Sequence, residues 1–153
     1  MVHSSLKPPF LRDPRAPARA ALLTGATGGI GAAFARTLPP ETSLVLTGRD
    51  GAALEVMAEE HLGRATTVVA DLSTGEGIDK VVEAAEAAEC DLLINNAGIG
   101  MTGAFLDVAL EDQLATVRVD VEAALALTHR LVPGMLARAE RDGSRAGVIN
   151  VAS

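Results

Sequence analysis

Short apolar runs alternate with helical patterns from Ala20 to the last residue of this chain. The runs are rich in Leu, Val and Ile, which is typical of strands buried inside a sheet. Between them, apolar residues recur at the spacing of amphipathic helices, so we expect repeated strand–helix–strand units and a parallel sheet. The predicted strands are residues 20–25, 43–48, 66–71, 91–98 and 147–153, and the predicted helices are residues 30–38, 52–62, 75–89 and 110–141.

The last predicted helix carries an apolar stripe. Its members recur at helical spacing and are Leu114, Val117, Val121, Leu125 and Thr128. Such a stripe is either a core face or an interface face. The predicted strand 147–153 also has no charge or proline that would discourage pairing along its edge. We therefore expect self-association, with a homo-oligomer formed through the 110–141 helix.

The first residues of the chain differ from the rest. Residues 1–19 hold four prolines among basic side chains, a composition that disfavours both helix and strand. We expect a disordered Pro/Arg-rich tail, followed by one domain over residues 20–153. A length of 153 residues suits a single domain, and a hydrophobic content of 48% is enough for a core.

Charge and cysteine content narrow the class of protein. A net charge of -7 argues against general affinity for nucleic acid or anionic membrane. No apolar run approaches the roughly 20 residues of a membrane-spanning helix, and no secretory signal is visible. Cys90 is the single cysteine and suits a reducing compartment, so we expect a cytoplasmic protein. His129 has no second ligand at a metal-binding spacing, so no metal site is assigned.

The strongest chemical signal follows the first predicted strand. The sequence LLTGATGGIGAAFAR, residues 22–36, leaves that strand, turns through several glycines and enters a helix. In this context backbone N–H groups and the positive end of the helix can face a pyrophosphate. Glycine is needed wherever a Cβ would block the ligand or the packing of the helix. The segment therefore predicts a nucleotide site.

The spacing of this loop, T-G-x-x-x-G-x-G, resembles the short-chain dehydrogenase/reductase family. Three further segments extend the resemblance: NNAG at 95–98, Ala70–Asp71, and NVAS at 150–153. They are similar to the family's sheet-end motif, its adenine contact and the segment of its catalytic serine. The resemblance implies a Rossmann-like, doubly wound α/β fold with the first strand central. It also implies a dinucleotide lying across the carboxyl ends of the strands.

The glycine loop and the resemblance together give a candidate cofactor site. Its residues are Thr24, Gly25, Thr27, Gly28, Gly29, Ile30, Gly31, Arg49, Asp71, Leu72, Asn96, Ala97 and Gly98. In the resembled family Asn96 would mainly support the central sheet. Asp71 would contact the adenine ring, although it could instead cap the turn into the next helix.

Residues after the second predicted strand indicate which dinucleotide is preferred. Arg49 stands where a guanidinium can pair with a 2′-phosphate, so NADP(H) is favoured. An acid at the end of the strand would have suited the ribose hydroxyls of NAD, and that position holds Gly48. Asp50 lies close by, so NAD(H) binding stays possible.

Hydride transfer also needs a group that moves a proton at the substrate oxygen. In the resembled family this group is the tyrosine of a Tyr-x-x-x-Lys pair, and a serine polarises the substrate. Ser153 matches that serine, but the chain contains no tyrosine. The family's relay asparagine falls on Asp120, whose carboxylate could hold a water or turn to solvent. We therefore expect a sheet truncated after its fifth strand, the N-terminal portion of a longer enzyme.

The resemblance favours an NADP(H)-dependent oxidoreductase acting on a small-molecule carbonyl or alcohol, present as a fragment without the Tyr-x-x-x-Lys part. A non-catalytic dinucleotide-binding or sensor module is the alternative. An extended-branch epimerase or dehydratase would also accept the spacing of Gly25, Gly28 and Gly31, but NNAG argues against it. The residues that select a substrate would follow Ser153, so the sequence does not identify the substrate.

Overall fold

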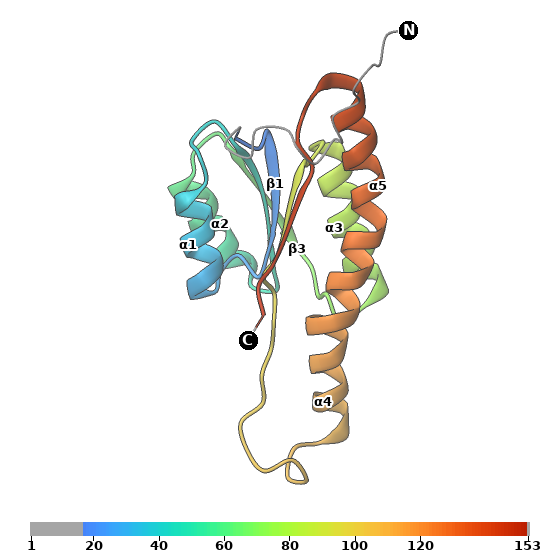
Figure 1. Ribbon diagram of the computed structural model, residues 1–153. Helices are drawn as coiled ribbons and strands as arrows, with labels where there is room; N and C mark the ends of the chain where they lie inside the picture. The colour runs from blue at the N-terminus through green and yellow to red at the C-terminus, as the bar shows by residue number, and fades with distance from the viewer. Residues whose placement is uncertain (1–16, 153) are drawn as a thin grey trace, which may run out of the picture.

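A five-stranded parallel sheet lies between two layers of helices in the computed structural model, which describes residues 17–152 (Figure 1). The strands are β1 (Ala20–Thr24), β2 (Ser43–Gly48), β3 (Ala65–Val69), β4 (Leu92–Asn95) and β5 (Gly147–Asn150). The helices are α1 (Gly29–Thr37), α2 (Gly51–Glu60), α3 (Gly75–Ala87), α4 (Leu110–Val117), the π-helical η2 (Arg118–Ala123) and α5 (Ala124–Asp142).

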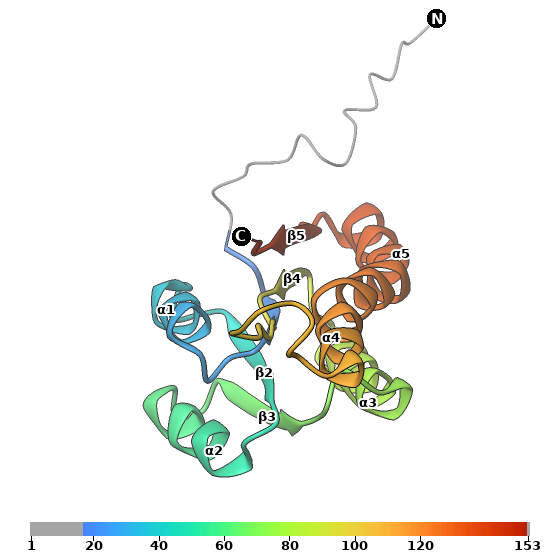
Figure 2. The same cartoon turned by 90° about the horizontal axis from the view of Figure 1, so that it is seen from below.

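The strand order β3-β2-β1-β4-β5 confirms the predicted doubly wound α/β fold with the first strand central. Helices α1 and α2 cover one face of the sheet, and α3 and α5 cover the other (Figure 2). All pairings are parallel. The chain winds outward from β1 in one direction and then crosses to β4 on the other side. Ligands of such folds bind at this reversal, beyond the carboxyl ends of the strands.

Each central strand is apolar on both faces because helices cover both. In β1, Leu23 belongs to the core cluster with Leu54 of α2, whereas Leu22 belongs to the cluster with Leu127 of α5. All four leucines of these pairs are essentially inaccessible to solvent. Burying such a side chain contributes about 1.5–3 kcal/mol. The continuous apolar runs in the sequence follow from this two-sided burial.

Four of the five predicted strands end too late. The prediction gave residues 20–25, 66–71, 91–98 and 147–153, whereas β1 ends at Thr24, β3 at Val69, β4 at Asn95 and β5 at Asn150. β4 ends because the backbone N–H groups of Asn96 and Ala97 donate to the hydroxyl of Thr24, both at 2.9 Å, and not to a neighbouring strand. The remaining residues of NNAG therefore leave the sheet and form a loop.

The long predicted helix is real, but its predicted stripe is not its core face. The residues that pack on the sheet are Val119, Ala123, Leu127, Leu131, Met135 and Ala139. The predicted stripe is largely exposed, from 40% at Leu114 to 69% at Leu125, while Thr128 is half-buried. The helix has two apolar faces, and the sheet takes the one that begins at Val119. The predicted stripe is therefore not a core face within residues 17–152.

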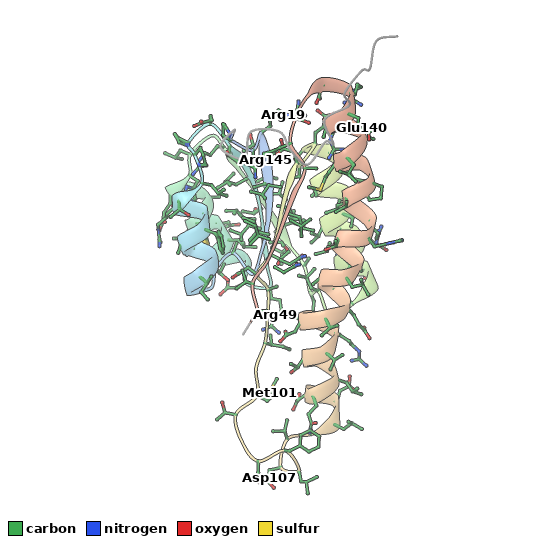
Figure 3. All side chains as sticks on the ribbon, in the orientation of Figure 1. Arg19, Arg49, Met101, Asp107, Glu140 and Arg145 are labelled. Atoms are coloured by element: carbon green, nitrogen blue, oxygen red, sulfur yellow. The ribbon has the colours of Figure 1, made fainter. Side chains whose placement is uncertain are left out.

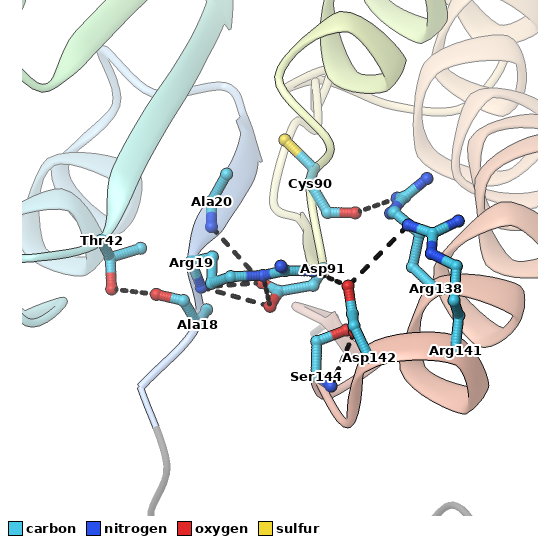
Figure 4. Close-up of polar contacts among 10 residues, drawn as sticks. All are labelled: Ala18, Arg19, Ala20, Thr42, Cys90, Asp91, Arg138, Arg141, Asp142 and Ser144. Carbon is cyan, nitrogen blue, oxygen red and sulfur yellow. Dashed lines mark hydrogen bonds and ion pairs between the residues drawn. The ribbon is translucent and has the colours of Figure 1, made fainter.

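A buried carboxylate ties the amino ends of the strands together (Figure 4). The side chain of Asp91 is only 1% exposed and accepts from the backbone N–H groups of Arg19 (3.1 Å) and Ala20 (3.4 Å). The guanidinium of Arg19 lies 3.8 Å from Asp91 and 3.1 Å from Asp142 at the end of α5. A buried carboxylate requires such partners, since an unpaired one would be strongly destabilising.

The packed part of the chain therefore begins earlier than predicted. Ala18 is 4% exposed within the core, and its carbonyl accepts from the hydroxyl of Thr42 at 2.7 Å. Both Ala18 and Arg19 lie within the predicted tail. Pro17 is exposed, and residues 1–16 of that tail lie outside the described residues.

A second buried polar cluster fixes the turn after α2. The guanidinium of Arg64 donates to the carbonyls of Pro39 and Thr42 and to Nδ1 of His61 (3.2 Å). Because arginine can only donate, Nδ1 must accept, and the ring must be neutral. Burial and then the charge of Arg64 lower the pKa of His61 below its ordinary value of 6.5.

We predict that His61 makes stability depend on pH in weakly acidic solution. Its folded pKa is depressed, so its contribution is complete above about pH 6.5 and is lost as pH falls from there toward the folded pKa. The melting temperature should therefore drop between about pH 7.5 and pH 5. His61→Gln should flatten this slope, while the control His129→Gln, at an exposed helix position, should keep it. Equal slopes for wild type and His61→Gln would contradict the prediction.

Candidate functional site

A cavity of about 370 Å³ opens beyond the carboxyl ends of β1, β2 and β4. Its lining residues are Gly25, Thr27, Gly28, Gly29, Ile30, Gly31, Gly48, Arg49, Ala70, Asp71, Leu72, Asn96, Ala97, Gly98, Ile99 and Val119. Every residue of the predicted cofactor set lines this cavity except Thr24. The cavity sits at the reversal of strand order, where the doubly wound fold places its ligands.

Two glycines of the loop are required by close packing. Gly25 has a φ of 63°, and a Cβ there would lie 2.7 Å from Cα of Ala97. A Cβ on Gly31 would overlap the carbonyl oxygen of Gly25 and lie 2.9 Å from the side-chain nitrogen of Asn96. A Cβ on Gly29 would meet no protein atom within 4 Å. Gly25 and Gly31 thus allow the loop to pack against NNAG, whereas Gly29 keeps the cavity open.

Thr24 is buried beneath the cavity and joins β1 to the end of β4. Its hydroxyl oxygen accepts from the backbone N–H groups of Asn96 and Ala97, both at 2.9 Å, and donates to the carbonyl of Ile94. Asn96 completes the connection, since its amide donates to the carbonyls of Thr24 (3.0 Å) and Gly25 (3.1 Å). Thr24 therefore holds the site together without facing a ligand.

The amino end of α1 points its unpaired N–H groups toward the cavity. The helix begins at Gly29, and no side chain caps its first turn. Its first three residues, Gly29, Ile30 and Gly31, all line the cavity. The first N–H groups of a helix lack partners within it and carry partial positive charge, so this wall suits an anion.

Charged side chains stand at the other wall. Asp71 accepts from the backbone N–H (2.9 Å) and hydroxyl (2.8 Å) of Ser73; these bonds, aided by the charge of Arg49, lower the pKa of Asp71. Asp71 thus caps its own turn and also lines the cavity. Asp50 accepts from the N–H of Ala53 as the cap of α2. Arg49 forms no ion pair with any residue between 17 and 152.

The two candidate catalytic residues are placed differently. Ser153 lies outside the described residues. Asp120 belongs to η2 and is exposed, but its carboxylate accepts from the backbone N–H of Ile99 at 2.9 Å and so holds the loop after β4. Asp120 is therefore not simply turned to solvent. It does not line the cavity, although its neighbour Val119 does.

Sequence reasoning missed two residues of the site, Ile99 and Val119, which both line the cavity. Ile99 adjoins the predicted Gly98, so a wider window would have included it. Val119 gave no signal, because only the packing of η2 brings it to the cavity. Asn95, which begins the NNAG motif, does not line the cavity, and its amide donates to Thr128 and Asn150.

Three other features were sought in the described part of the chain: a metal site, a membrane-spanning helix and a reactive cysteine. Within residues 17–152, no three His, Cys, Asp or Glu side chains gather closely enough to hold a metal ion. Over the same residues, no helix is both long and apolar enough to cross a membrane. Burial raises the pKa of the Cys90 thiol to about 12, so it is a packed side chain rather than a nucleophile.

Comparisons with known proteins agree with this geometry. A model of the family described as short chain dehydrogenase matches residues 19–153. Nodulation protein G of Rhizobium meliloti (strain 1021) is 36% identical over 138 residues, covering 88% of this chain and 54% of its own length. Oxidoreductase UcpA of Escherichia coli (strain K12) is 32% identical over 130 residues, covering 82% and 49%. The chain spans about half the length of these curated relatives.

Two solved structures share the fold. A metagenomic short-chain oxidoreductase in complex with NADP superimposes with a TM-score of 0.78 at 33% identity, covering 88% of this chain and 62% of that one. L-Sorbose reductase from Gluconobacter frateurii, complexed with NADPH and L-sorbose, gives a TM-score of 0.70 at 34% identity, covering 80% and 49%.

We predict opposite outcomes for alanine at two glycines of the loop. Gly31→Ala should lower the free energy of unfolding by about 1–3 kcal/mol, because the methyl group collides with backbone that cannot easily move. Gly29→Ala should change it by less than about 0.5 kcal/mol, because the methyl group meets open space. Chemical denaturation of both variants measures this. Equal losses would show that the loop does not pack on NNAG as described.

Proposed function

This chain belongs to the short-chain dehydrogenase family, and on that premise we propose that its residues form one NAD(P)-binding domain serving hydride transfer. The proposed reaction interconverts a small-molecule carbonyl and alcohol, with NADP(H) as the preferred cofactor. The observation that carries the proposal is a cavity bounded by a glycine loop, a helix end without a side-chain cap, and Arg49, which forms no ion pair within residues 17–152.

The residues present fit a 2′-phosphorylated dinucleotide. The helix end at Gly28–Gly31 would hold the pyrophosphate, and Arg49 would pair with the 2′-phosphate. Asp71 and Leu72 would contact the adenine, leaving the wall at Asn96 and beyond for the nicotinamide. Two structural neighbours are complexes with NADP and NADPH, which supports the preference. The rival acid, Asp50, is engaged as a helix cap.

When bound, the cofactor would supply or accept the hydride, and the residues of this chain would bind and orient it. Proton transfer at the substrate oxygen requires a further group. The sequence holds no tyrosine, so we propose catalysis for a protein that also carries a Tyr-x-x-x-Lys pair. In that protein Ser153 would polarise the substrate oxygen, and Asp120 would position the loop after β4 through Ile99.

A non-catalytic dinucleotide-binding module is the second candidate. The cavity itself supports it, since a dinucleotide could bind among the residues that line the cavity without any further group. Turnover of a carbonyl substrate with NADPH would separate the two candidates. We also propose a cytoplasmic location, supported by the single cysteine, Cys90, which is buried and has no second cysteine in this sequence to pair with.

We predict that Arg49 decides between the two dinucleotides. Arg49→Met should weaken NADPH binding about tenfold or more, because it removes a charge-assisted pair with the phosphate, and should leave NADH within about twofold. Fluorescence titration with each nucleotide measures both. Arg36→Met is the matched control. It removes a cation of α1 that forms an exposed ion pair with Glu60 of α2. Equal weakening of NADPH and NADH would remove the role given to Arg49.

We further propose that the stripe on α4, η2 and α5 joins two copies of this chain. Leu114, Val117, Val121 and Leu125 remain 40–69% exposed along one continuous helical run. An uninterrupted apolar row of this length is unusual on the surface of a monomer. Residues spaced by three and four along a helix can interlock with the same row of a second copy.

We predict that Val117→Lys with Val121→Lys shifts the protein from a self-associated species to a monomer in sedimentation velocity. Charges placed on both sides of an apolar contact repel and must be desolvated. Val56→Lys, at a 58% exposed valine of α2, is the control and should leave the assembly unchanged. A wild-type monomer at all concentrations would overturn the proposed interface.

A further inference from the structure

A second cavity, of about 330 Å³, adjoins the first at the edge of the sheet. The two cavities share Arg49, Ala70 and Asp71. The outer cavity is completed by Val69 at the end of β3 and by the start of α3, through Thr74, Glu76, Gly77 and Lys80. A ligand held at Arg49 therefore faces both cavities, and the outer one contains a cation that the proposed function does not use.

The wall formed by α3 is held in place by its first turn. The hydroxyl of Thr74 accepts from the N–H of Gly77 at 3.0 Å, and it donates to the carbonyl of Asp71 at 2.9 Å. A Cβ on Gly77 would overlap that same carbonyl, so only glycine lets α3 approach so closely. Lys80, one turn further along α3, is thus carried on a wall fixed against Asp71.

Lys80 forms an exposed ion pair with Glu76, and an anionic ligand can take the place of Glu76. Its ammonium lies 2.8 Å from the carboxylate of Glu76, and the two side chains are 56% and 79% exposed. A pair so open to solvent contributes little to stability. Asp71, the other acid of this cavity, is occupied by Ser73. A dianionic phosphate beside Arg49 would attract Lys80 more strongly than a single carboxylate does.

We propose that Lys80 is a second determinant of selectivity for the 2′-phosphorylated dinucleotide, acting with Arg49 from the opposite wall of the outer cavity. The inference rests on the proposed function and adds a residue to it. Lys80 exchanges Glu76 for the phosphate when NADPH binds. Glu76 competes for Lys80 and therefore opposes that exchange.

The test measures the dissociation constants of NADPH and NADH by fluorescence titration. It compares one variant expected to weaken NADPH binding with another expected to tighten it. Lys80→Met should weaken NADPH about threefold to tenfold and leave NADH within about twofold. Glu76→Gln should instead tighten NADPH by about twofold to threefold, since it removes the competing carboxylate. Lys80→Arg keeps the charge and should restore selectivity. Arg36→Met, on the opposite face of the sheet, controls for net charge.

The outcomes separate this proposal from the one it rests on. If wild type binds neither nucleotide, the proposed function fails, and the role of Lys80 fails with it. If wild type prefers NADPH but Lys80→Met leaves the ratio of the two constants unchanged, only Lys80 is overturned. Equal weakening of both nucleotides, or the same effect from Arg36→Met, would also overturn it, because each indicates a general effect of charge.

Discussion

The candidate site depends on the hydrogen bonds that join the end of β1 to the end of β4. Thr24 receives the N–H groups of Asn96 and Ala97, while Asn96 donates to the carbonyls of Thr24 and Gly25. These bonds bring the glycine loop against the NNAG segment, and glycine at position 31 is what permits the contact. Without them the two walls of the cavity would be separate loops. The chemistry of the site therefore begins with a structural connection between strands.

The two ends of the sheet have different roles. The amino ends of the strands stabilise the fold, and the carboxyl ends form the candidate site. At the amino ends, the buried Asp91 is neutralised by backbone N–H groups and Arg19, which fixes the strands (Figure 4). At the carboxyl ends, the N–H groups of α1 and the guanidinium of Arg49 are left without protein partners among residues 17–152. A helix amino end without a side-chain cap, at the carboxyl ends of the strands, suits an anion. Figure 3 shows Arg49 on the side of the sheet from which the loop bearing Met101 departs.

Much of this arrangement could be predicted from the sequence because it is local. Buried strands read as apolar runs, and a glycine loop between strand and helix predicts its own cavity. Features that depend on tertiary contacts were not predictable in the same way. The face of α5 that packs on the sheet, the place of Val119 and the packing of Ala18 all follow from which neighbour an apolar residue finds. A single helix with two apolar faces offers no way to choose between them from its own sequence. The carboxylate of Asp120 was likewise assigned two possible roles, and its bond to Ile99 depends on a loop whose path the sequence does not specify.

The central claim is that NADPH binds in the cavity between the glycine loop and NNAG. The most direct measurement is a titration of the isotope-labelled protein with NADPH, following each backbone amide by two-dimensional NMR. The account predicts saturable shifts concentrated at Gly28–Gly31, Arg49, Asp71 and Asn96–Ile99, because these backbone groups surround the proposed ligand. An absence of shifts, or shifts gathered on the exposed face of α4 instead, would contradict it.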